Sequence, residues 1–188
     1  MPTASEQRSE FVGLLERSVA YALGSVHAVS PAMMSRATPC RSWDLRTLLA
    51  HTNDSLAVLC EGADGAIGRP RTDRSTDPLA TFRTRATWAL GAWSAGPAGP
   101  VRIGGATLPS VAVAGAGAIE IAVHGWDIAM ATGRYRAIPS SLAEALLSLC
   151  PLLVAETGRH PMFGPPVSVH ALATPGDRLV ALLGRAPV

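Results

Sequence analysis

The sequence predicts an all-α protein, a helical bundle with a short hairpin or irregular insertion and a decorated C-terminus. Three observations predict this. Apolar residues recur at helical spacing over several long segments. These segments begin at recognisable N-terminal caps. One of them, residues 110–132, is apolar on every side except at three positions, which is typical of a helix in the interior of a bundle.

Composition limits the class of protein. A chain of 188 residues can build one full hydrophobic core, so we expect a single domain over residues 1–188. With 48% apolar residues, it is not a disordered chain. A formal charge of +2 gives no drive toward nucleic acid or acidic membranes. The basic residues are all arginine, and the absence of lysine excludes Schiff-base chemistry and a phosphate-binding P-loop.

The cysteines and the apolar segments indicate the cellular compartment in which we expect the protein. Cys40, Cys60 and Cys150 are widely spaced and odd in number, so we expect reduced thiols in a cytoplasmic protein. The first ten residues are polar and contain no apolar signal region. The apolar stretch 111–130 is interrupted by ionisable side chains, which favours a buried helix over a membrane span.

The first half of the chain predicts three helices. Helical spacing of apolar residues predicts the first over residues 5–28. Asp44 is the expected N-cap of the second, whose apolar stripe runs from Leu45 to Leu59. Asp77 and Pro78 are expected to open the third. Residues 64–76 between the last two are expected to form an exposed loop.

The second half predicts a hairpin and further helices. Residues 96–109 break the helical pattern and are expected to turn around Gly104–Gly105. A helix over residues 110–132 should stop at Gly133. A capping box, Ser141-x-x-Glu144, predicts a fifth helix through about residue 156, bent at Pro151. The tail from residue 163 is expected to be irregular, with one or two helical turns after residue 177.

The three ionisable residues of the 110–132 helix are the candidate site. Glu120, His124 and Asp127 are spaced by four and three residues, so they share one helix face. His51 flanks the buried stripe of the second helix. Two histidines and one carboxylate from facing helices would give a divalent metal three ligands and leave coordination positions for water or substrate. Spacing alone also allows a hydrogen-bonded or ion-paired Glu–His couple without metal.

Further residues carry alternatives. Asp127 could orient a ligand histidine by accepting a hydrogen bond from it, or from an arginine, or it could be a buried ion pair with Arg134 or Arg136. Trp43 and Trp126 could line a pocket or belong to the core.

Other reactive side chains receive no role. Cys40 is expected to be a structural thiol, and no catalytic nucleophile is assigned. A loop with three arginines could clamp a carboxylate, but a solvated loop is favoured. These arginines are Arg69, Arg71 and Arg74, and the histidines left without a role are His27, His160 and His170.

Three segments carry a family resemblance. They are TPCRSWDLRTLLAH (38–51), EIAVHGWDIAMATGR (120–134) and FGPPVSVHALATPGDRLVALLGR (163–185). With the patterns T-P-C-x-x-W-D…L-x-x-H and E-x-x-x-H-x-W-D, the chain resembles actinobacterial metal-binding proteins of the DinB-like superfamily. These proteins are related to the N-terminal domain of mycothiol-dependent maleylpyruvate isomerase. The resemblance implies a four-helix bundle whose metal is held by His51, Glu120 and His124.

The resemblance also implies a function. We expect a metal-dependent enzyme, similar to a thiol S-transferase, that activates a low-molecular-weight thiol such as mycothiol for transfer to, or isomerisation of, an electrophilic small molecule. Zinc is the expected metal, and nickel or ferrous iron also suit the donors. The alternative is a small-molecule-binding module without catalysis, with the metal structural or absent. The two-domain isomerase has a further C-terminal domain that this chain is too short to hold, so maleylpyruvate isomerisation is not carried over. We expect a monomer or homodimer that binds neither nucleic acid nor membrane.

Overall fold

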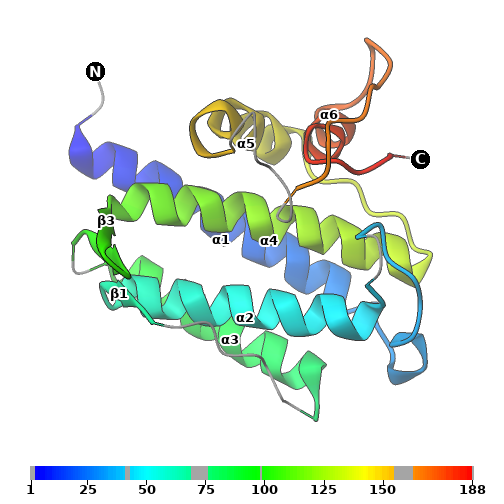
Figure 1. Ribbon diagram of the computed structural model, residues 1–188, viewed down its shortest axis with the longest axis horizontal. Helices are drawn as coiled ribbons and strands as arrows, with labels where there is room; N and C mark the ends of the chain where they lie inside the picture. Colours follow the sequence, from blue (N-terminus) through cyan, green and yellow to red (C-terminus); the bar gives the residue numbers. More distant parts are fainter. Residues whose placement is uncertain (1–2, 41–42, 69–75, 98, 155–162, 188) are drawn as a thin grey trace.

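The computed structural model describes residues 3–40, 43–68, 76–97, 99–154 and 163–187. Within these residues the chain forms six α-helices, one short 3-10 turn and three short strands, so the predicted helical bundle is confirmed (Figure 1). The elements are α1 (Ala4–Val26), the 3-10 turn (Pro31–Met33), α2 (Leu45–Ala63), β1 (Ala66–Ile67), α3 (Pro78–Ser94), β2 (Val101–Ile103), β3 (Ala106–Leu108), α4 (Ser110–Thr132), α5 (Ser140–Leu153) and α6 (Pro175–Leu182).

Helix α4 is the centre of the bundle. It packs against α1, α2 and α5, while α3 packs against α2 and α1, and α6 packs on α5 (Figure 1). Its small residues allow close contact: a Cβ on Gly125 would lie 3.0 Å from the Cα of Ala22 in α1. Among the described residues, α4 is the one helix long and apolar enough to cross a membrane, but 72% of that apolar window is buried inside the protein.

Local sequence signals set most helix ends. Asp44 caps α2 by accepting a hydrogen bond from the Thr47 amide at 2.8 Å. Asp77 accepts from the first amides of α3, with Pro78 at the first helical position. Gly133 ends α4 in the left-handed conformation, with φ of 73°. These three predicted boundaries are confirmed.

Two predicted helix starts in the C-terminal part are wrong. Helix α5 begins at Ser140 directly after Pro139, and no side chain caps it, because Ser141 already lies inside the first turn. Helix α6 begins at Pro175, before residue 177, because Thr174 caps it by accepting from the Asp177 amide at 3.2 Å. Pro151 lies inside α5, which ends at Leu153. Val154 already has an extended backbone, so the expected continuation of the helix to about residue 156 is wrong.

The hairpin is confirmed and gains a third strand. β2 and β3 pair antiparallel, with Ile103 opposite Ala106. β1 pairs in parallel with β2, although it lies within residues 64–76, where the sequence predicted a loop. Its two residues are too short to produce an alternating pattern. The arginines expected in that loop, Arg69, Arg71 and Arg74, lie outside the described residues.

Candidate metal centre

Helices α2 and α4 bring His51, Glu120 and His124 together. The Nε2 atom of His51 lies 2.7 Å from Oε1 of Glu120, and Nε2 of His124 lies 3.2 Å from the same oxygen. One nitrogen from each ring and one oxygen of Glu120 all lie within 4.8 Å of one another. The sequence predicted that these three residues would meet, and the fold brings them together because α2 and α4 pack along their lengths.

Three donors converge on a single carboxylate oxygen. Besides the two imidazoles, the hydroxyl of Ser55 donates to Oε1 of Glu120 at 3.1 Å. Ser55 lies one turn after His51 on α2, so both face the same way. Sequence reasoning missed Ser55, although its spacing of four residues from His51 was a readable signal.

The cluster spans a gradient from interior to solvent. The side chain of His124 is only 6% exposed, whereas Glu120 and His51 retain 27% and 39% of their side-chain surface. The indole of Trp43 lies beside the solvent-facing His51, with ring centroids 4.8 Å apart, and 6.4 Å from His124. Trp43 therefore does border the site. Trp126 is 1% exposed and belongs to the hydrophobic core.

Behind His124, a fully buried carboxylate fixes the imidazole. Oδ2 of Asp127 lies 2.9 Å from Nδ1 of His124. The guanidinium of Arg185 donates two hydrogen bonds to the same carboxylate, from NH2 to Oδ2 at 2.8 Å and from Nε to Oδ1 at 3.3 Å. Asp127 thus does orient a candidate ligand, as one reading of the sequence proposed. The arginine partner is Arg185, so the alternative of an ion pair with Arg134 or Arg136 is wrong.

The charges in this cluster stabilise one another. Burial alone would raise the pKa of Glu120, but the charge of His124 and hydrogen bonds from both histidines outweigh it, so that pKa lies well below its usual value. Burial would lower the pKa of His124, yet the Glu120 charge and the hydrogen bond to Asp127 raise it well above 6.5. The pKa of Asp127 is lowered against its burial by His124 and Arg185. Without metal, the two carboxylates on either side of His124 therefore favour its imidazolium form.

Cys40 joins this network on the side of Asp127. Its Sγ atom lies 3.2 Å from Oδ2 of Asp127 and accepts a hydrogen bond from NH2 of Arg185 at 3.2 Å. Cys40, His124 and Asp127 form a second group whose ligand atoms lie within 4.8 Å of one another. No spacing in the sequence predicted this contact, because Arg185 is 145 residues away from Cys40 along the chain.

The donor set fits a divalent metal. Ligands held at about 2.0–2.1 Å in a tetrahedral shell are about 3.3 Å apart. The 2.7 and 3.2 Å separations of Glu120 Oε1 from the two imidazole nitrogens need only a small expansion to reach that value. Two neutral imidazoles and a carboxylate suit zinc, nickel or ferrous iron. An ion there would replace the protons that the two rings now share with Glu120.

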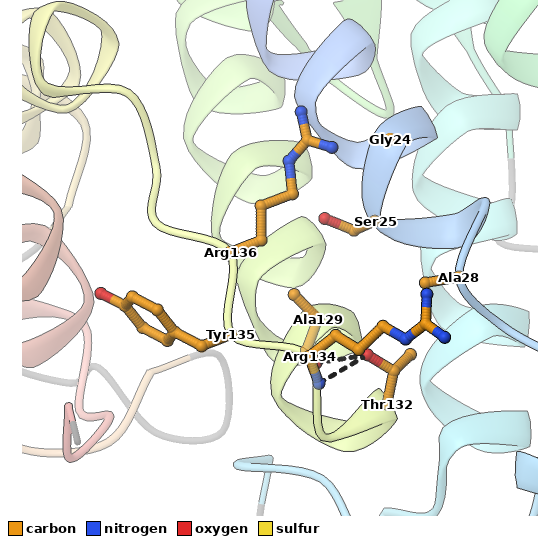
Figure 2. Close-up of a pocket in the computed structure, with 8 residues that line it drawn as sticks. All are labelled: Gly24, Ser25, Ala28, Ala129, Thr132, Arg134, Tyr135 and Arg136. Carbon is orange, nitrogen blue, oxygen red and sulfur yellow. Dashed lines mark hydrogen bonds between the residues drawn. The ribbon is translucent and has the colours of Figure 1, made fainter.

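A surface pocket of about 240 Å³ lies elsewhere, between α1, the end of α4 and the segment after it. Figure 2 shows Arg134 and Arg136 beside Ser25 and Ala28 of α1. None of the residues of either ligand group lines this pocket. It is therefore separate from the candidate metal centre.

A comparison with protein families identifies the family to which this chain belongs. Residues 15–129 match the family model of the mycothiol maleylpyruvate isomerase N-terminal domain. No curated protein and no solved structure matches the chain. The matched region includes α2, α4 as far as Ala129 and every residue of the two ligand groups, and it covers more than half of the sequence. The chain therefore belongs to the mycothiol maleylpyruvate isomerase N-terminal domain family, which is DinB-like.

Proposed function

We propose that this protein is a metal-dependent enzyme that activates a low-molecular-weight thiol, such as mycothiol, for transfer to or isomerisation of an electrophilic small molecule. The observation that carries the proposal is the convergence of His51 Nε2 and His124 Nε2 on Glu120 Oε1 at the edge of a buried helix pair. We propose zinc as the ion, held by these three residues. Three protein ligands are typical of catalytic zinc sites, whereas structural sites have four.

Each residue has a distinct task in this proposal. Glu120 supplies the negative charge that a divalent ion needs, and Ser55 holds its Oε1 in place. Asp127 accepts from Nδ1–H of His124, which leaves Nε2 of that ring as the ligand atom. When bound, the metal supplies a positive charge that lowers the pKa of a thiol beside it and so favours the nucleophilic thiolate.

The direction of substrate approach follows from exposure. His51 and Glu120 are the more exposed members of the group, and Trp43 lies next to His51, so a small molecule would reach the site from this side. The family name refers to mycothiol and to an isomerase, which supports a thiol as co-substrate. A small-molecule partner, a single domain over the whole chain and a reducing cytoplasmic setting belong to the same proposal.

The metal-binding half of the proposal is tested by elemental analysis. We expect about one zinc per chain in the purified protein and none in the His51→Ala, His124→Ala double variant. His27→Ala is the matched control, because this exposed histidine belongs to neither ligand group. Equal metal in wild type and double variant would mean that the ligands are wrong.

The catalytic half is tested by conjugation of mycothiol to model electrophiles, with and without a chelator. We expect activity to be lost on chelation and in Glu120→Gln, and to return when zinc is added back to the wild type only. Activity that is indifferent to metal removal would reject the mechanism. Stoichiometric metal with no turnover of any thiol would favour the alternative, a binding module whose metal is structural, and chelation would then mainly lower the melting temperature.

A further inference from the structure

The second ligand group has donor types that bind zinc strongly, yet a fixed positive charge lies against it. Cys40 Sγ, His124 Nδ1 and an oxygen of Asp127 are close enough to share an ion. Thiolate, imidazole and carboxylate are all zinc ligands. Both groups contain His124, through opposite nitrogens of its ring. Something must therefore decide which group a metal uses.

Arg185 occupies the second group. Its NH2 atom lies 2.8 Å from Oδ2 of Asp127 and 3.2 Å from Sγ of Cys40. The guanidinium keeps its charge at any physiological pH. An ion coordinated by Cys40 and Asp127 would lie beside this charge and would compete with it for the same lone pairs. By contrast, all hydrogen bonds of the described residues to Glu120 Oε1 come from Ser55 and the two imidazoles.

The backbone around Arg185 holds the guanidinium in place. After α6 the chain turns back through Gly184, at φ of 85°, with Gly184 N–H donating to Ala181 and Arg185 N–H to Val180. This is the hydrogen-bond pattern of a Schellman motif. NH1 of Arg185 also donates to the carbonyl of Leu183 at 2.8 Å, and the residue is 7% exposed. Moving the side chain away would break several buried hydrogen bonds at once.

We propose that Arg185 excludes divalent metals from the Cys40–His124–Asp127 group and so directs them to His51, Glu120 and His124. It is a positioning residue, which acts by neutralising Asp127 and keeping it as the acceptor for His124 Nδ1–H. This inference rests on the proposed metal function. Arg185 lies beyond residues 15–129, so the C-terminal segment supplies a selectivity determinant that the matched family region does not contain.

Cobalt(II) titration tests the inference, because thiolate coordination gives a near-ultraviolet sulfur-to-cobalt charge-transfer band that nitrogen and oxygen ligands do not give. The wild type should bind one equivalent with only ligand-field bands. Arg185→Met should gain the charge-transfer band, with loss of the Cys40 thiol proton to buffer. Arg185→Met combined with Cys40→Ser should lose it again. Arg185→Lys keeps a positive charge and should resemble the wild type.

A charge-transfer band in the wild type would overturn the inference. So would its absence in a folded Arg185→Met variant saturated with cobalt. If Arg185→Met does not fold, Cys40→Ser in the wild-type background still decides. An unchanged cobalt spectrum and stoichiometry support exclusion of Cys40, and a changed spectrum contradicts it.

Failure of the proposed function would look different. In that case the wild type binds no cobalt at all, while Arg185→Met gains a Cys40-dependent site. This result would support exclusion by Arg185 and reject the His51–Glu120–His124 centre. If neither protein binds cobalt, both proposals fall.

Discussion

Replacing Asp127 with asparagine should destabilise the metal-free protein severely. The carboxylate is fully buried and receives two hydrogen bonds from Arg185, at 2.8 and 3.3 Å, and one from His124 at 2.9 Å. Asparagine has almost the same shape but no charge, so the guanidinium of Arg185 would stay buried without its anion. Breaking a buried ion pair in this way costs about 3–5 kcal/mol. For a chain of this size we expect a fall in melting temperature of roughly 6–20 °C.

The assay is thermal and urea unfolding in the presence of a chelator, which removes any contribution of metal. Asp54→Asn is the matched control. Asp54 lies 3.9 Å from Arg85, and the two side chains are 29% and 26% exposed, so loss of this ion pair should cost at most about 1 kcal/mol. The double variant Asp127→Asn, Arg185→Met removes both charges and should be more stable than Asp127→Asn alone.

Two results would refute this reasoning. If Asp127→Asn costs no more than Asp54→Asn, Arg185 is solvated in solution and does not depend on Asp127. If the double variant is no more stable than Asp127→Asn, the cost does not arise from an orphaned charge on Arg185.

Three further predictions concern backbone geometry and pH. Gly184→Ala should lower the free energy of unfolding in urea by about 1–3 kcal/mol, because the residue has a positive φ and its Cβ would lie 2.7 Å from the Cα of Gly164. An unchanged free energy of unfolding would contradict the left-handed turn at Gly184. Gly125→Ala should lower the free energy of unfolding, because its Cβ meets the α1 backbone. Gly24→Ala should cost less, because its Cβ meets only the guanidinium end of Arg136, a flexible side chain that can shift. If both melt alike, close packing of α1 and α4 is wrong. The surroundings of His124 raise its pKa above 6.5, so the protonated ring stabilises the metal-free folded protein. This contribution to the free energy of unfolding is complete below pH 6.5 and is lost as the pH rises through the raised pKa. Zinc must displace that proton, so affinity measured by calorimetry should rise about tenfold per pH unit up to the raised pKa; a flat profile would exclude His124 as a ligand.

Most of the fold could be predicted from the sequence because helices are determined locally. The row Glu120, His124 and Asp127 shares a face simply through the helical period, and Asp44 and Asp77 cap the helices that they precede. The predicted starts of α5 and α6 are wrong by only a few residues. Helix α5 begins directly after Pro139, and Thr174 caps α6. β1 was missed because two residues carry no period.

The pairing of His51 with Glu120 needed more than local pattern. It was predicted because both residues lie at the buried stripes of apolar helices, which must pack to hide them. The family resemblance favoured a metal site over a metal-free couple, and the structure places the Nε2 atom of His51 2.7 Å from Oε1 of Glu120.

By itself, the sequence determined the helices, the apolar faces and the row of ionisable groups on α4, because all of these depend on spacings of three and four residues. Only the tertiary structure decided which side chains from other parts of the chain contact that row. Arg185 lies 58 residues from Asp127 and Cys40 lies 87 residues from it. The path of the chain between such residues depends on how the whole bundle packs, and on a glycine turn after α6, so no periodicity in the sequence connects them.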